Sequence, residues 1–386
     1  MGIFSAKHNK NFIVIDIGGN AVSVGLIVNT SPKTCPQITT SVSTPIEYGS
    51  PVSMPYYERS LTRGLQNTLT SIQKKTGQLS GKFICLLPSL LSHNTVLRIQ
   101  YDDPKGFTVT PKIVNNIVEK NIREWLRSEI FSSIKCRLLE SVILNISVNG
   151  YSIKDPYNKK ATRLELSVYA SVAETKILDR LDSLLSNYNG GKKVTYITSA
   201  LAHYRVIADL FPYQTDFLFV DPTGELCDLL YVSNGILRGH ISFPVGGSTV
   251  LRHLVDSTGT VKSEAGSTIA LYVANSLPVT INSKTTKSLE SLQNTWSKQM
   301  TLALKEASNY GAIPQQVFVL DDDPAARLYA KWINEVGFQD LRLGGGKLTA
   351  ILLGRSQLEN LCPGPENLPY QLGLALGGLF ARNLGE

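Results

Sequence analysis

The sequence has 386 residues, and 38 Lys and Arg residues against 31 Asp and Glu residues give it a formal net charge of +7. Hydrophobic residues make up 42% and charged residues 18% of the chain, which excludes a disordered or fibrous protein. It contains no run of 18 or more apolar residues, so we expect no segment to span a membrane.

The first part of the chain, residues 1–94, has the pattern of one lobe of an α/β protein. Asn11–Asn29 is predicted to form a β-hairpin with its turn over Asp16–Asn20. Apolar residues at helical spacing predict a helix over Leu61–Ile72, and Phe83–Leu87 is predicted to be a buried strand.

Residues 95–190 change in character, and we interpret them as a compact αβ insert. Val96–Gln100 is predicted to be a strand that ends in a turn over Asp102–Gly106. Thr110 and Pro111 form a helix start, with the hydroxyl as the cap and proline in the first helical position. Two strands and a helix are predicted to follow, at Ser141–Ser147, Arg163–Ala173 and Glu174–Ser186.

A second cycle of strands begins at Val194, and we assign residues 191–386 to a second lobe. After a helix over Ala200–Leu210, strands are predicted at Phe217–Asp221, Cys227–Val232, Ile236–Phe243 and Gln316–Leu320. Helices are predicted at 248–257, 262–275, 287–310 and 324–336. Gly344–Gly346 is predicted to be a linking turn, and the chain closes with a Gly-rich apolar helix over Pro369–Asn383.

Scattered cysteines and histidines argue against a disulfide framework and against a zinc site. The five residues of each kind lie far apart in the sequence, and the odd cysteine count favours reduced thiols. The N-terminus lacks an apolar leader segment, so we expect a cytoplasmic protein. The charge is mild and contains no long Lys/Arg run, which gives no reason to expect a nucleic-acid partner.

One pattern, an apolar strand followed by an Asp, a Gly-containing turn and a returning strand, occurs twice. It reads FIVID-IGGN-AVSVGLIV from Phe12 and FLFVD-PTGE-LCDLLYV from Phe217. A tight turn that contains glycine presents backbone N–H groups to an anion. The aspartates that end the strands, Asp16 and Asp221, can hold a hydrated Mg²⁺. Two such hairpins facing one cleft would bind a triphosphate, whereas two ordinary hairpins are the alternative.

The two hairpins resemble the phosphate-1 and phosphate-2 loops of the actin and sugar-kinase superfamily. Three further segments are similar to the bacterial FtsA and PilM proteins within it: Ile236–Gly247 (ILRGHISFPVGG), Asn149–Val168 (NGYSIKDPYNKKATRLELSV) and Leu368–Ala381 (LPYQLGLALGGLFA). The resemblance implies an α/β, actin-like two-lobe fold of ribonuclease H-like repeats with a small inserted αβ subdomain. The insert would correspond to the SHS2 domain of that family, and the last helix would return to the first lobe.

The resemblance also implies a nucleotide site in which Asp16 and Asp221 hold Mg²⁺. The residues expected around ATP and Mg²⁺ are Asp16, Gly18, Gly19, Asn20, Asp221, Thr223, Gly224, Asp228, Gly246, Gly247 and Glu264. Glu264 is included because a helix lining the site in this family often carries an Ala-Glu pair, and a solvated helix residue is the alternative. No residue is expected to be catalytic.

Three loops depart from the superfamily pattern. The first lacks the usual Thr or Ser after its glycines and has Asn20 there. The second keeps one of three glycines and adds Pro222, which has no N–H to donate, and the acidic Glu225. The loop expected at the adenosine carries Asp321–Asp323 in place of a Gly pair. We therefore expect weak or lost ATP binding and negligible turnover, as in a pseudo-ATPase.

By this resemblance we expect a cytoplasmic scaffold at the inner face of the inner membrane. It would act in type IV pilus assembly, like PilM, or in cell division, like FtsA. The sequence ends directly after the closing helix, without the amphipathic anchor of FtsA, so we expect membrane contact only through partners, and pilus assembly is slightly favoured.

The expected partner is the cytoplasmic tail of a membrane protein, or another component of the division or pilus machine. By resemblance, the tail would dock near the helix Pro111–Leu126. Self-assembly, including polymerisation without nucleotide, stays open. The alternative class is a small-molecule kinase or phosphatase of the same superfamily, which would need an intact adenosine loop.

Overall fold

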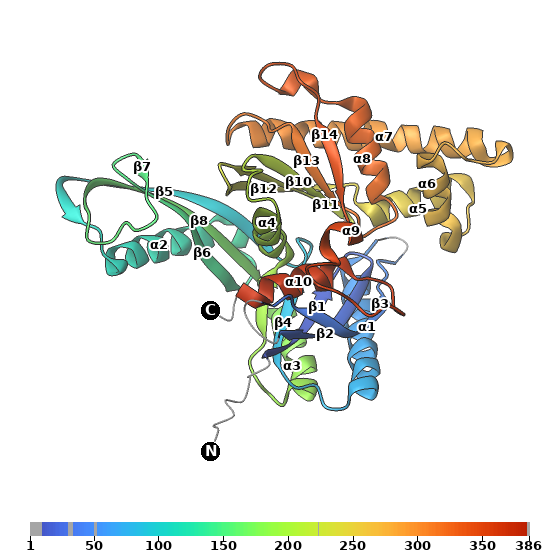
Figure 1. Cartoon of the computed structure of the whole chain (residues 1–386), viewed down its shortest axis with the longest axis horizontal. Helices are drawn as coiled ribbons and strands as arrows, with labels where there is room; N and C mark the ends of the chain where they lie inside the picture. Colours follow the sequence, from blue (N-terminus) through green and yellow to red (C-terminus); the bar gives the residue numbers. More distant parts are fainter. Residues whose placement is uncertain (1–9, 30–33, 50–51, 223, 384–386) are drawn as a thin grey trace.

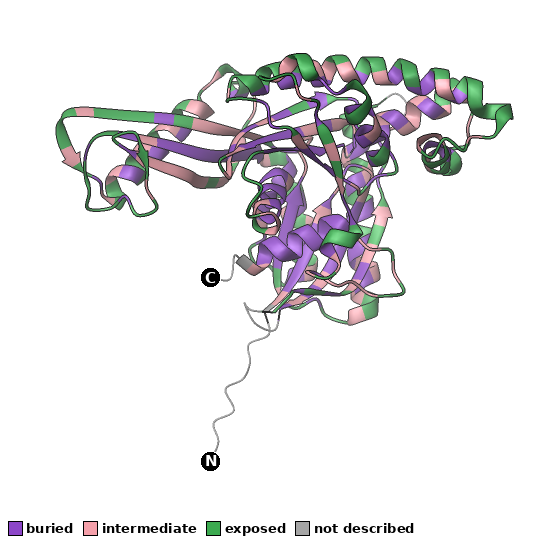
Figure 2. Cartoon of the chain, turned by 45° about the horizontal axis from the view of Figure 1, so that its top comes forward, coloured by how far each residue is buried: buried purple, intermediate pink, exposed green. Residues whose placement is uncertain are grey.

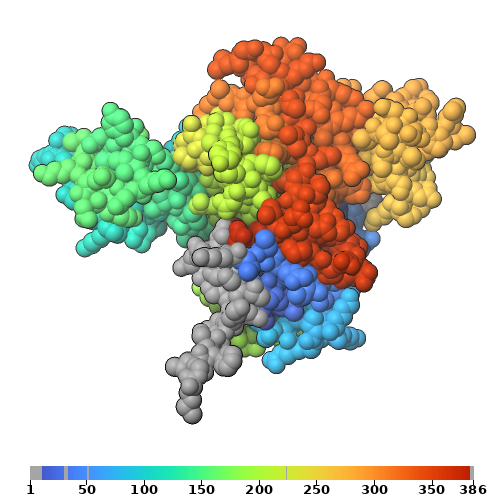
Figure 3. All heavy atoms as spheres, in the orientation of Figure 1, coloured from blue at the N-terminus to red at the C-terminus, as the bar shows by residue number. Residues whose placement is uncertain are grey.

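The computed structural model describes residues 10–29, 34–49, 52–222 and 224–383 of the chain. Within these residues the strands form three sheets, two of five strands and one of four. Figure 1 shows a first lobe that holds the N-terminal strands, a second lobe above it, and an arm that projects to the left from their junction. Figure 3 shows this arm standing clear of both lobes over most of its length.

The first-lobe sheet has the strand order β3-β2-β1-β4-β9. Its strands are β1 (Lys10–Ile17), β2 (Ala21–Asn29), β3 (Gln37–Pro45), β4 (Lys82–Leu87) and β9 (Thr195–Thr198). The helices that cover it are α1 (Met54–Thr76), α3 (Thr175–Asn189), α4 (Ser199–Leu210) and α10 (Leu372–Asn383). β1 is apolar on both faces because Ile13 and Ile15 pack with α1 and α3, whereas Phe12 and Val14 pack with α4 and α10.

The second-lobe sheet repeats this topology, with the order β12-β11-β10-β13-β14. Its strands are β10 (Phe217–Asp221), β11 (Leu226–Ser233), β12 (Ile236–Pro244), β13 (Gln316–Leu320) and β14 (Thr349–Leu353). The accompanying helices are α5 (Gly247–Thr258), α6 (Lys262–Val273), α7 (Val279–Ser308), α8 (Ala326–Val336) and α9 (Arg355–Leu358). In each lobe three antiparallel strands are followed by two parallel ones, and the core of the second lobe holds Trp296 and Trp332.

The arm has a sheet of its own in the order β5-β8-β6-β7. Its elements are β5 (His93–Thr108), α2 (Pro111–Leu126), a short 3₁₀ helix (Glu129–Phe131), β6 (Cys136–Val148), β7 (Tyr151–Ser152) and β8 (Lys160–Glu174). Thr110 caps α2 as predicted, accepting a hydrogen bond from the Ile113 N–H at 3.3 Å. The apolar residues of α2, Val114 and Val118 among them, face one side of this sheet and bury it.

The structure differs from the sequence-based predictions in several elements. Strand β9 was assigned to the second lobe with residues 191–386, but it pairs with β4 in the first-lobe sheet. The predicted turn Asp102–Gly106 is a bulge inside β5, whose register with β8 shifts between Asp102 and Phe107. Helix α3, predicted to belong to the insert, packs with α1 in the first-lobe core. Strand β14 was not predicted, because it is short and follows the glycine run Gly344–Gly346 after only two residues.

Burial follows the layers of the two lobes. Figure 2 shows buried residues along the central strands of both lobes and along α10, whereas the outer side of α7 is exposed. Among the described residues, no helix combines the length and the apolar character that crossing a bilayer requires.

Candidate functional site

The turns of the two hairpins meet at one cavity between the lobes. Asp16, Gly18 and Gly19 line its first-lobe side, and Asp221 and Asp228 line its second-lobe side. The cavity has a volume of about 30 Å³. A single water molecule needs about 10–15 Å³ by the same measure, and a typical ligand pocket has about 300–1,000 Å³. In this arrangement the cavity therefore has room for water and not for a nucleotide.

The two turns touch each other at Gly224. Its φ is +81°, and a Cβ atom placed on it would lie 2.8 Å from the Gly19 Cα and 2.8 Å from the Tyr48 hydroxyl oxygen. Tyr48 donates a hydrogen bond of 2.5 Å to the Gly19 carbonyl and so fixes the first turn from behind. Glycine is needed at position 224 because the two backbones approach this closely.

The N-terminus of α5 uses its donors within the second lobe. The N–H groups of Gly246, Gly247 and Ser248 donate to the carbonyls of Glu225, Pro222 and Gly224 at 3.1, 2.5 and 2.9 Å, respectively. A helix N-terminus binds an anion through such free N–H groups. In this arrangement the three groups have protein partners, so Gly246 and Gly247 could donate to a phosphate only after these bonds break.

Glu225, which follows Gly224, is held by the same helix. Its carboxylate accepts hydrogen bonds from Arg252 at 2.6 and 2.7 Å and from the Thr249 hydroxyl at 2.9 Å. This bidentate pair neutralises the glutamate beside the cavity.

Asp16 and Asp323 have surroundings that favour the protonated carboxyl. Burial raises the pKa of Asp16 to about 6, with His203 lowering it and Asp221 raising it further. Burial also raises the pKa of Asp323 to about 6, against hydrogen bonds from the Ala325 N–H and the Asn20 side chain. The loop Asp321–Asp323 therefore brings the Asp323 carboxylate toward the site. A further negative charge there disfavours binding of a polyanion such as ATP.

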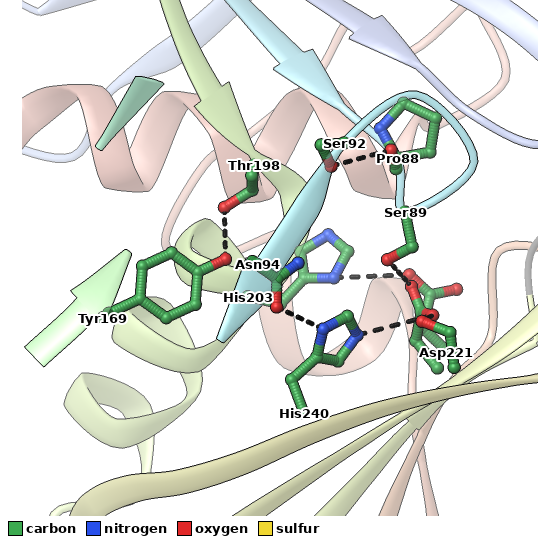
Figure 4. Close-up of polar contacts among 11 residues, drawn as sticks. Pro88, Ser89, Ser92, Asn94, Tyr169, Thr198, His203, Asp221 and His240 are labelled. Carbon is green, nitrogen blue, oxygen red and sulfur yellow. Dashed lines mark hydrogen bonds and ion pairs between the residues drawn. The ribbon is translucent and has the colours of Figure 1, made fainter. Parts of the chain in front are cut away.

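Two aspartate–histidine pairs lie beside the cavity. Figure 4 shows His203 pointing toward Asp221, and their Nδ1 and Oδ2 atoms are 3.4 Å apart. His240 Nε2 lies 3.4 Å from Asp228 Oδ1. Both imidazoles are buried between the sheet of the second lobe and the neighbouring elements.

Asp228 also connects the second lobe to the other two parts of the molecule. It accepts hydrogen bonds from Ser89 at 2.6 Å and Ser242 at 2.5 Å, and His240 contacts the side chain of Asn94 through Nδ1. Burial raises the pKa of Asp228, but the charge and hydrogen bond of His240 and the two hydroxyl donors outweigh it, so the pKa lies below its usual value. Figure 4 shows Ser89 and Asn94 reaching this cluster from the β4–β5 connection and the start of β5.

These groups form hydrogen bonds that connect parts of the molecule. The Ser89 hydroxyl donates to a carboxylate and not to an imidazole, so it lacks the base that activates a serine nucleophile. Among the described residues, no group of three or more His, Cys, Asp or Glu side chains could hold a metal ion. Mg²⁺ at Asp16 and Asp221 would therefore depend on phosphate oxygens and water for its other ligands.

The predicted site residues fall into four groups. Asp16, Gly18, Gly19, Asp221 and Asp228 line the cavity. Asn20, Gly224, Gly246 and Gly247 lie beside it in contacts between or behind the turns. Glu264 lies in the first turn of α6 with an exposed side chain and does not line the cavity. Thr223 lies outside the described residues.

Several residues of the site were missed from the sequence. They are Tyr48, Ser89, Asn94, His203, His240 and Asp323. The histidines stood alone in the sequence, and no spacing linked them to an aspartate. The only available signal was the run Asp321–Asp323, which was interpreted as a damaged adenosine loop and not as a source of contacts.

The comparisons with known proteins agree with this fold. The structure matches a PilM–PilN type IV pilus biogenesis complex with a TM-score of 0.60 and 13% sequence identity, over 95% of this chain and 97% of that chain. It also matches ethanolamine utilization protein EutJ from Carboxydothermus hydrogenoformans (TM-score 0.43, 11% identity, 94% and 88% coverage). A Bacteroides thetaiotaomicron protein with an actin-like ATPase fold and unknown function matches with a TM-score of 0.38 and 7% identity, over 94% of this chain and 98% of that chain.

No family model matches the sequence, and no curated protein matches it. The chain has the actin-like α/β fold that the sequence predicted.

Proposed function

We propose that this protein is an actin-like assembly scaffold that binds a cytoplasmic segment of a membrane protein, as in type IV pilus assembly, and does so without nucleotide turnover. The observation that carries the proposal is the match to a PilM–PilN complex over nearly the full length of both chains. The protein would lie in the cytoplasm at the inner membrane and reach the membrane through its partner.

The cavity supports the part of the proposal that concerns nucleotide. Its volume of about 30 Å³ leaves no space for a triphosphate in the closed arrangement, and the three N–H groups at the start of α5 already have partners. For the same reason the kinase or phosphatase alternative has less support. Any ATP binding would need the lobes to separate, so that Asp16 and Asp221 could hold Mg²⁺.

A groove on the arm is suited to the partner segment. Helix α2 covers one face of the arm's sheet, and the opposite face borders β12 across a hollow of about 310 Å³. Its polar lining includes Arg98, Gln100, Asn145 and Glu165, together with Arg238 from β12. β5 is the edge strand of its sheet in the described residues, and β12 is the edge strand of the second-lobe sheet. An extended segment can therefore lie across this face of the arm's sheet, beside β12.

The charge of the groove points to an acidic segment. The Arg98 guanidinium lies 4.8 Å from the centre of the Tyr310 ring, and neither Arg98 nor Arg238 forms an ion pair with a described residue. Burial and the charge of Arg98 lower the pKa of Arg238. A carboxylate from the partner would relieve the repulsion between the two guanidinium groups.

Peptide binding tests this function. Synthetic peptides that cover the cytoplasmic segments of the host's single-span membrane proteins would be titrated into the full chain, with fluorescence anisotropy as the readout. We expect one segment to bind, and Arg238→Glu to weaken it by about tenfold or more, which corresponds to about 1.4 kcal/mol. The matched control is Arg123→Glu, the same charge reversal on the exposed side of α2. If both variants bind the segment equally well, the groove is not the binding site. If no segment binds the parent protein, the proposed function is wrong.

A further inference from the structure

Asn20 joins the two lobes with both ends of its side-chain amide. Its Nδ2 donates to Oδ2 of Asp323, and its Oδ1 accepts from the Ser248 hydroxyl. Asn20 lies in the first-lobe turn, whereas both partners belong to the second lobe. The residue that replaces the usual hydroxyl of the phosphate-1 loop therefore bonds to protein across the cleft.

Asp323 lies between two helix N-termini. Its Oδ1 accepts a hydrogen bond of 2.7 Å from the Ala325 N–H just before α8. The carboxylate also presses against the start of α5, because a Cβ atom on Gly247 would lie 2.6 Å from its Cγ. The side chain is only 5% exposed. Asp323 therefore fills the space at the start of both helices and receives a backbone hydrogen bond from the start of α8.

The same residues that depart from the nucleotide-binding pattern thus make the contacts that close the cleft. Asn20 stands in the first degenerate loop and Asp323 in the third, and they meet each other. Gly224 in the second loop completes the closure by its contact with Gly19.

We propose that Asn20, Ser248 and Asp323 form an interlobe latch, held by the two hydrogen bonds of the Asn20 amide, so that the lobes close without nucleotide. The latch deepens the proposed function and rests on its nucleotide-independent part, since it gives the scaffold one fixed shape for its partner. It does not depend on which segment the arm binds.

The latch is placed where it can resist opening. Its side chains lie in the interior of the interface, with Asp323 and Ser248 buried. A second interlobe contact, the ion pair of Lys262 with Glu47 at 3.2 Å, has side chains that are 79% and 54% exposed. Exposed pairs of this kind contribute little, so Glu47→Gln is the matched control for loss of a cross-cleft contact.

Interlobe distance measures the latch directly. Spin labels would be attached to cysteines at Lys74 in α1 and Asn294 in α7, both exposed, after replacement of Cys35 and Cys136 by serine. The other three cysteines are buried. Double electron–electron resonance then reports the distance distribution for the parent and for Asn20→Ala, Asp323→Asn and Glu47→Gln, with and without millimolar Mg·ATP.

The parent protein is expected to give one narrow distribution that Mg·ATP leaves unchanged. Asn20→Ala loses both bonds and is expected to shift or broaden the distribution, and Asp323→Asn, which keeps the side-chain volume, is expected to do so to a smaller extent. Glu47→Gln should match the parent. Circular dichroism confirms that each variant is folded.

Two results would overturn the latch. One is a parent distribution that is broad alone and narrows with Mg·ATP, and the other is a folded Asn20→Ala variant with the parent's distribution. Neither result touches peptide binding by the arm, so failure of the latch and failure of the proposed function are distinguishable.

Discussion

The two hairpin turns lie between strands of the same sequence pattern, but their side chains form hydrogen bonds to different parts of the molecule. The first turn sends the amide of Asn20 across the cleft to Ser248 and Asp323. The second turn sends its carbonyls and the Glu225 carboxylate to α5 of its own lobe. The two hairpins therefore pair their strands in the same way, whereas the side chains of their turns differ: Asn20 bonds across the cleft and Glu225 bonds within its own lobe.

The largest expected loss of stability follows from adding a methyl group at Gly224, where the two turns touch. Gly224→Ala must keep a φ of +81° and places its Cβ 2.8 Å from the Gly19 Cα. The left-handed backbone and the overpacking together should reduce the free energy of unfolding by about 4 kcal/mol. The measurement is urea denaturation followed by fluorescence.

Gly235→Ala is the matched control for Gly224→Ala. Gly235 has a φ of +70° in the β11–β12 turn, but a Cβ there meets no atom within 4 Å. Only the cost of the left-handed backbone remains, so we expect Gly235→Ala to lower the free energy of unfolding by about 1–2 kcal/mol. Equal losses for the two variants would show that the turns do not touch in solution.

Sequence reasoning captured the strands and their order because apolar runs and Gly turns are local signals. The two lobes, both hairpins and the cap of α2 at Thr110 follow from such signals. The contacts of Asn20 could not be predicted in this way, because Asp323 lies 303 positions away and its run of three carboxylates has no local partner. The sequence correctly marked Asn20 and Asp323 as unusual but could not bring them together.

The second prediction concerns pH and the carboxylate that the first turn reaches. An ordinary aspartate has a pKa of 3.8, and Asp323 in the folded protein has a pKa of about 6. The difference corresponds to about 3 kcal/mol of stability. Because the folded state holds the proton more tightly, this contribution is present below about pH 4 and is lost as pH rises through about 6. Asp323→Asn should flatten the fall in unfolding free energy over this range, measured by denaturation at stepped pH.

Asp16→Asn should also flatten the profile, since the pKa of Asp16 is raised to about 6 as well. Asp155→Asn, on an exposed loop of the arm, is the control that should leave the slope unchanged. A profile of Asp323→Asn that falls as steeply as that of the parent would contradict burial of the charge at this position.

The third prediction compares an Arg–Glu pair in each lobe. In the second lobe, Arg252→Ala leaves the largely buried Glu225 carboxylate without its bidentate partner and should cost about 2 kcal/mol. In the first lobe, Arg180→Ala breaks a pair with Glu58 whose arginine is 48% exposed, and should cost less than about 1 kcal/mol. Thermal denaturation of both variants ranks them, and the reverse order would mean that Glu225 does not depend on α5.

The smallest expected change in stability compares a helix of the arm with a helix of the first lobe. Helix α2 in the arm has a side-chain cap, because Thr110 accepts from the Ile113 N–H, whereas α3 in the first lobe has Glu174 at the cap position and no side-chain cap. Thr110→Ala should therefore lower the free energy of unfolding by about 1 kcal/mol, the usual loss for a capping hydroxyl. Glu174→Ala removes no capping hydrogen bond and should change it by less than about 0.5 kcal/mol. Hydrogen exchange shows where the effect lies. Faster exchange of Thr110→Ala that is confined to the first turn of α2 supports a local cap. Uniformly faster exchange across both lobes contradicts it, because the arm would then unfold only together with the lobes.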